Sequence, residues 1–68
     1  MKQLNAREVA RLLVPRGWVC VRMTGSHAQY KNPNYREVIT VAGHGARPIP
    51  EGLLKKILKQ AEIDPKTI

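Results

Sequence analysis

Two tight-turn signals divide the middle of this chain into three short segments that alternate like β-strands. Thr24-Gly25-Ser26 separates the first two segments, and Asn32-Pro33-Asn34 separates the second from the third. Glycine, proline, asparagine and serine favour turns because they adopt or fix the backbone angles of a sharp reversal. A parallel crossover needs a dozen or more residues, so connections this short join antiparallel neighbours. The pattern predicts a three-stranded antiparallel meander.

The predicted strands span residues 18–23, 27–31 and 36–41. In the first, one side carries Trp18, Cys20 and Arg22 and the other carries Val19, Val21 and Met23. In the second, Ala28 and Tyr30 point away from His27, Gln29 and Lys31. The third is rich in β-branched residues, which suit a strand. This alternation predicts that Arg22 and Lys31 share one side of the sheet with His27.

A helical pattern precedes the meander. Asn5 is a good N-cap, and Glu8 follows at the spacing of a capping box. Leu4 and Val9 stand where a hydrophobic staple forms. Pro15 ends the helix, because the residue before a proline is disfavoured in the helical conformation. Gly17 can adopt the left-handed conformation that commonly follows the last residue of a helix.

A second helical pattern follows a loop over residues 42–50. It starts near Pro50 or Glu51 and is closed by Asp64-Pro65. Its apolar face consists of Leu53, Leu54, Ile57, Leu58 and Ala61. Its polar face carries a ridge of three lysines, Lys55, Lys56 and Lys59.

The order of elements predicts one α+β domain over residues 1–68. Two amphipathic helices can cover one face of the sheet and leave the other open, which gives the two-layer α-β-β-β-α plan of double-stranded-RNA-binding domains (dsRBDs). Cys20 is the only cysteine, which excludes an internal disulfide and indicates a reducing cytoplasm. No secretory signal is expected from the N-terminus, and no apolar run approaches the ~20 residues of a membrane span.

The charge balance favours nucleic acid as a partner. Twelve Lys and Arg stand against five Asp and Glu, for a net charge of +7. Basic residues spread over a folded domain attract phosphate backbones, with an affinity that falls as salt rises. The alternative is that the charge serves solubility alone.

The turn Gly25-Ser26-His27 is the candidate reactive feature. Histidine moves protons near pH 7, so His27 can act as a general acid or base. Gly25 permits a positive φ, and Ser26 or turn N–H groups can bond a phosphate oxygen. The alternative is an ordinary hairpin turn in which His27 has a structural role.

Other candidates are weaker. His44, between two glycines, can complete an acid–base pair or contact substrate, and Arg22, Lys31 and the three lysines of the second helix can contact phosphates. Each lysine can equally be part of a solvated face. Two histidines without a nearby cysteine or carboxylate pair make a poor zinc site, so no metal or other cofactor is expected. Trp18 and Tyr35 can stack bases, although packing is expected of Trp18.

Three blocks of sequence resemble the HicA toxins, the mRNA-cleaving halves of bacterial HicAB toxin–antitoxin modules. The blocks are Gly25-Ser26-His27 with Tyr30, then Ile39-Thr40-Val41 with His44 and Gly52-Leu53, then Ile57-Leu58-Lys59-Gln60-Ala61 with Ile63. The resemblance runs from Asn5 to Ile63. It implies a dsRBD-like fold, ribonuclease activity against mRNA without a cofactor, a HicB-type antitoxin partner and a catalytic role for His27.

The chain also departs from that family pattern. Ala42-Gly43 stands before His44 where a proline is common, and Glu62 replaces a glycine at the end of the last helix. Three functions are therefore compared: an RNA-cleaving toxin, a non-catalytic RNA-binding module of the same fold, and a small structural or adaptor domain. The second predicts binding without strand scission, and the third predicts no RNA retention at moderate salt.

Overall fold

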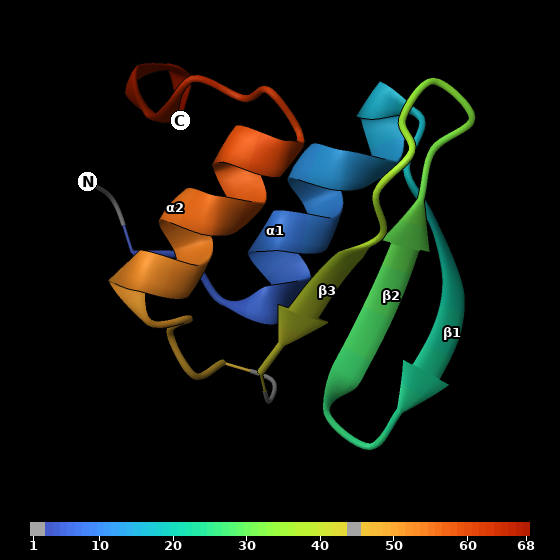
Figure 1. Cartoon of the computed structure of the whole chain (residues 1–68). Coiled ribbons are helices and arrows are strands. Elements are labelled where there is room, and N and C mark those ends of the chain that lie inside the picture. The colour runs from blue at the N-terminus through green and yellow to red at the C-terminus, as the bar shows by residue number, and fades with distance from the viewer. Residues whose placement is uncertain (1–2, 44–45) are drawn as a thin grey trace.

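The computed structural model describes residues 3–43 and 46–68, and these follow the predicted order of helix, three strands and helix (Figure 1). The helices and strands are α1 (Ala6–Leu13), β1 (Val19–Thr24), β2 (His27–Lys31), β3 (Ile39–Ala42) and α2 (Glu51–Gln60). Two short 3₁₀ helices follow α1 and α2, namely η1 (Val14–Arg16) and η2 (Pro65–Thr67). The strands form one antiparallel sheet in the order β1-β2-β3, which confirms the meander.

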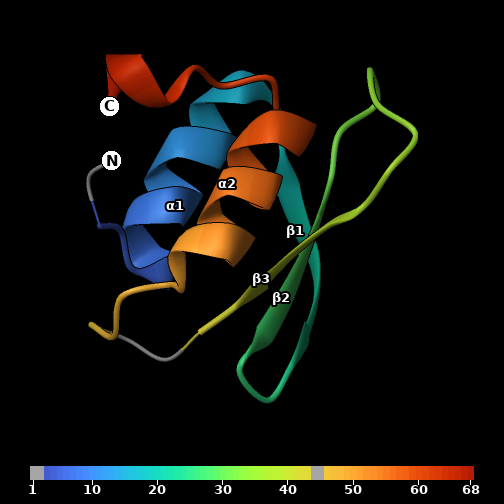
Figure 2. The ribbon, with the colours of Figure 1, turned by 60° about the vertical axis from the view of Figure 1, so that its left-hand side comes forward.

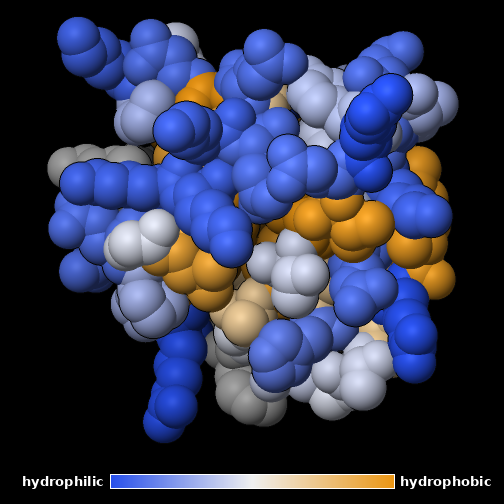
Figure 3. Space-filling view, viewed as in Figure 1, coloured by the Kyte–Doolittle hydropathy of each residue, from blue (hydrophilic) through white to orange (hydrophobic). Residues whose placement is uncertain are grey.

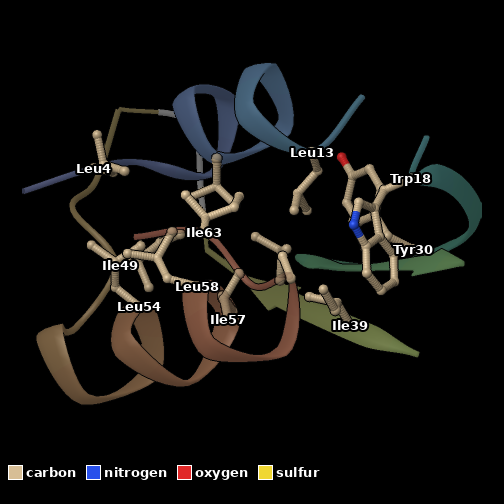
Figure 4. Close-up of a cluster of buried hydrophobic side chains, with 14 residues drawn as sticks. Leu4, Leu13, Trp18, Tyr30, Ile39, Ile49, Leu54, Ile57, Leu58 and Ile63 are labelled. Carbon is tan, nitrogen blue, oxygen red and sulfur yellow. The ribbon is translucent and has the colours of Figure 1, made fainter. Parts of the chain in front are cut away.

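Both helices lie on the same side of the sheet, so the fold has two layers (Figure 2). The strand residues that face the helices are buried, namely Ala28, Tyr30, Ile39 and Val41. They join side chains of α1 and α2 in one hydrophobic core (Figure 4). The predicted α+β class, with two helices on one face of a three-stranded sheet, is confirmed. In the described ranges, neither helix has the length and apolar character that crossing a membrane requires.

The capping box predicted for α1 is present. The Asn5 Oδ1 atom accepts a hydrogen bond from the Glu8 backbone N–H at 2.8 Å, and Glu8 Oε1 accepts one from the Asn5 N–H at 3.0 Å. Leu4 and Val9, the expected staple, are both buried in the core. Two donors that the first turn leaves unpaired are thereby satisfied, which fixes where the helix begins.

The helical segment that ends at η1 closes with a Schellman motif. The Trp18 N–H donates to the Leu13 carbonyl at 3.2 Å, and the Gly17 N–H donates to the Val14 carbonyl at 3.1 Å. Gly17 has the left-handed φ of 94° that the motif requires, as predicted. The motif turns Trp18 into the core, where its side chain is 1% exposed. Packing, rather than base stacking, is therefore the role of Trp18.

Helix α2 closes with the same motif but without the glycine. The Ile63 N–H donates to the Leu58 carbonyl at 2.8 Å, and the Glu62 N–H donates to the Lys59 carbonyl at 3.1 Å. Glu62 takes the left-handed position with a φ of 56°. The helix ends at Gln60, so the prediction that Asp64-Pro65 closes it was wrong. The buried contact between Ile63 and Leu58 ends it earlier.

The third strand is shorter than predicted, beginning at Ile39 instead of Arg36. The cause is Asn32, whose buried side chain donates to the Arg16 carbonyl at 3.0 Å and accepts from the Asn34 N–H at 2.9 Å. The Tyr35 N–H also donates a hydrogen bond to the Asn32 carbonyl at 3.0 Å. Together these bonds extend the turn beyond Asn34. The ladder therefore resumes where Ile39 lies opposite Tyr30.

Strand β1 spans residues 19–24 and contains an irregularity that the sequence did not show. Cys20 lies opposite Tyr30, but Arg22 lies opposite Gln29, so Val21 is the extra residue of a β-bulge. Residues opposite each other share a face of the sheet. Cys20 therefore points to the helix side and Arg22 to the open side. The prediction that these two residues share a side was wrong.

The strained end of α2 can be relieved by restoring glycine. The left-handed conformation costs a residue that has a side chain roughly 1–2 kcal/mol, and glycine avoids this cost. Part of the gain from glycine is lost again, because glycine has a greater conformational entropy in the unfolded chain. We expect Glu62→Gly to stabilise the protein by about 0.5–1 kcal/mol and to raise Tm by about 2–8 °C. Thermal unfolding followed by circular dichroism measures this. Glu62→Gln is the control, because it removes the charge and keeps the strain; an equal gain in both variants would refute the explanation.

Candidate functional site

The candidate site is built on the two-residue turn between β1 and β2. Thr24 ends β1 and pairs with His27, which begins β2, so Gly25 and Ser26 alone make the connection. Gly25 has a φ of 57°, and glycine with positive φ at the first turn position is typical of type II′ hairpins. The Ser26 carbonyl accepts a hydrogen bond from the Gly43 N–H at 3.0 Å, which attaches the turn to the segment after β3.

His27 lies on the open face of the sheet. Its chain neighbour Ala28 is buried against the helices, and strand alternation turns His27 to the opposite side. Its partners across the sheet are Thr24 on β1 and Ala42 on β3, both with small side chains. The imidazole is therefore exposed to solvent and accessible to a large substrate.

Two cations share this face with His27, as predicted. Lys31 is on the same strand, four residues away, which corresponds to about 13 Å along an extended chain. Arg22 lies opposite Gln29 and so diagonally across from both His27 and Lys31. Diagonal neighbours in an antiparallel sheet are about 7–8 Å apart. All three side chains are exposed, so a polyanion that lies along β2 can contact Lys31, Arg22 and His27 in turn.

The lysine ridge of α2 is divided by the fold. Lys56 lines a groove of about 150 Å³ with Thr40 and Ala42, at the edge of β3 where Ala42 pairs with His27. Lys55 and Lys59 are exposed on α2, in the layer that covers the other face of the sheet. The structure therefore brings Lys56 toward the open face and leaves Lys55 and Lys59 apart from it.

Two further expectations concern His44 and metals. His44 lies outside the described residues. Within residues 3–43 and 46–68, no three His, Cys, Asp or Glu side chains are grouped so that they could hold a metal ion.

A second groove lies under the turn and was missed by sequence reasoning. It has a volume of about 390 Å³ and is lined by Arg7 and Ala10 of α1, Met23 of β1, and Ser26. Met23 lies opposite Ala28, on the helix side, as the alternation from the turn predicted. Arg7 is exposed in the first turn of α1. Nothing in the sequence showed which strand it would meet.

Tyr35 is fixed near the start of β1. Its ring lies 4.8 Å from that of Trp18, centroid to centroid, at an interplanar angle of 34°. The nearby Glu62 carboxylate, which favours the protonated hydroxyl, raises the pKa of Tyr35 above its ordinary value, and desolvation adds to this. Tyr35 is therefore a neutral aromatic side chain with a defined orientation at neutral pH.

The sequence also matches a known protein family. The sequence model of a family described as the HicA toxin of bacterial toxin-antitoxin matches residues 6–63. The match covers most of the 68-residue chain, so this protein belongs to the HicA toxin family. It is thus the toxin of a toxin–antitoxin pair, whose cognate antitoxin is its partner. Among curated proteins, none matches the chain.

The turn conformation makes a prediction about stability. A Cβ atom on Gly25 would meet nothing within 4 Å, so the only cost of alanine there is its positive φ. We expect Gly25→Ala to destabilise the fold by about 1–2 kcal/mol in thermal unfolding.

Gly52 provides the matched control, because a Cβ there also meets nothing but the backbone is helical. Gly52→Ala should leave stability unchanged or higher. A Gly25→Ala protein as stable as the parent would mean that the turn does not hold the geometry described.

Proposed function

We propose that this HicA family member is a metal-independent endoribonuclease that cleaves mRNA, with His27 as a general acid or base. The observation that carries the proposal is the place of His27, exposed at the first residue of β2 and on one face with Arg22 and Lys31. The family supports a toxin, and the net charge of +7 supports a polyanionic substrate.

The chemistry uses a nucleophile that RNA carries and DNA lacks, the 2′-hydroxyl. A base removes its proton, and the 2′-oxygen then attacks the neighbouring phosphorus. The bond from phosphorus to the 5′-oxygen breaks, and an acid protonates that oxygen. The products are a 2′,3′-cyclic phosphate and a 5′-hydroxyl. His27 makes one of the two proton transfers, and His44 is the second histidine available for the other.

The cations of the open face hold the substrate. Arg22 lies between His27 and Lys31, so consecutive phosphates of a single strand can follow β2 past all three side chains. Lys56, at the edge of β3 beside Ala42, extends the positive surface past the histidine. Gly25 and Ser26 offer backbone N–H groups and a hydroxyl next to the scissile phosphate.

The same face provides the site of inhibition. A HicB-type antitoxin that covers His27 would exclude RNA, and an acidic surface on the antitoxin would complement Arg22 and Lys31. The cytoplasm is the compartment in which mRNA, toxin and antitoxin meet.

Loss of His27 should abolish most of the cleavage. We expect His27→Ala to reduce the cleavage rate of a 5′-labelled single-stranded RNA by about 10²–10⁴-fold, with EDTA present throughout. Gln29→Ala, two residues along the same strand and face, is the control and should retain activity. A DNA strand of the same sequence should remain intact.

Other results would contradict the assignment. If the His27→Ala protein cuts as fast as the parent, His27 is not catalytic. If parent and variant both bind RNA without cutting it, the protein is a non-catalytic RNA-binding module and His27 is a turn residue.

The cations make a separate prediction about binding. We expect Arg22→Gln and Lys31→Gln each to weaken RNA binding and to reduce the slope of log affinity against log salt concentration by about 0.7, as one lost phosphate contact on a single strand does. Fluorescence anisotropy in the His27→Ala background measures binding without cleavage. Lys66→Gln, an exposed lysine in η2, is the control; an equal change in slope there would mean that charge alone, without position, sets the affinity.

A further inference from the structure

The edge strand β1 exposes apolar side chains that neither the core nor the proposed chemistry uses. Val19 is 58% exposed and Val21 is 53% exposed. Apolar atoms gather on the side of the molecule that carries β1, bordered by hydrophilic ones (Figure 3). Grouped apolar exposure of this kind marks binding surfaces.

These two valines line a groove of about 410 Å³. Lys31 of β2 lies opposite Val19, and the β2–β3 loop adds Tyr35 and Arg36. The Tyr35 ring is fixed by its contact with Trp18, while Lys31 and Arg36 are exposed. The groove thus combines an apolar surface, an oriented aromatic ring and two cations. Its volume is in the range of small-ligand sites.

We propose that this groove is a nucleobase subsite that holds one base of a single-stranded RNA at a distance from the scissile phosphate. The base would lie against Val19, Val21 and Tyr35, and its flanking phosphates would contact Lys31 and Arg36. Lys31 belongs both to the groove and to the open face with His27, about 13 Å along β2. The inference rests on the proposed function, because it describes how the same RNA is held.

The geometry favours RNA over an added peptide strand. A peptide that extends the sheet at β1 needs a regular row of free N–H and C=O groups. The bulge at Val21 interrupts this row, and bulges are a means by which edge strands resist pairing. A base needs only apolar and aromatic surface beside a cation, which the groove offers.

Two RNA substrates of different length test the subsite. A dinucleotide can occupy only the scissile position, whereas a hexanucleotide also reaches the groove. We expect the double variant Val19→Ser/Val21→Ser to lower kcat/KM for the hexanucleotide by about tenfold through KM. The dinucleotide should be cut at the parent rate. Val14→Ser is the matched control, because Val14 is also 58% exposed but does not line the groove.

Hexanucleotide binding, measured in the His27→Ala background, tests the subsite independently of whether the protein cleaves RNA. Weaker hexanucleotide binding by the double serine variant, with a parent-like melting curve, supports the subsite even if no RNA is cut. Equal affinities of the double variant and the Val14→Ser control for the hexanucleotide overturn it. It is also overturned if the valine substitutions weaken only the binding of the antitoxin, since the groove would then belong to a protein interface.

Discussion

Burial of one face of the sheet is the constraint on which the rest of the structure depends. Ala28, Tyr30, Ile39 and Val41 lose their contact with water only under α1 and α2. A slip of one residue would turn these side chains to solvent, so the core fixes the pairing of the strands. That pairing in turn leaves His27 on the open face. A histidine that makes no contribution to the core is thus positioned by the apolar residues that alternate with it.

The sequence predicted well those features whose causes lie within a few residues of each other. The capping box of Asn5 and Glu8, the left-handed Gly17 and the turn at Gly25 are all local, and all are confirmed. The bulge at Val21 depends instead on how β1 meets β2. The late start of β3 depends on the Asn32 side chain reaching the Arg16 carbonyl, sixteen residues away. Distant contacts of this kind leave no pattern in a single sequence.

The candidate site likewise combines local features that could be predicted with distant contacts that could not. Strand alternation predicted that Arg22 and Lys31 share a side with His27, and they do, because the pairing between Arg22 and the turn is regular; the bulge instead turns Cys20 to the helix side. The lysines of α2 appeared as one ridge, but only Lys56 lies at the edge of the open face. The groove beside Val19 combines two strands and a loop, so it could not be recognised before these were placed together.

The central claim is that the RNA supplies its own nucleophile while His27 moves a proton. Replacement of a single 2′-hydroxyl by hydrogen in a short RNA, followed by mass spectrometry of the fragments, tests this claim most directly. The account predicts no cleavage at the phosphate next to the replaced sugar, and 2′,3′-cyclic phosphate ends wherever else the strand is cut. Cleavage next to the 2′-deoxy sugar would contradict it, because water or another nucleophile would then have attacked the phosphorus.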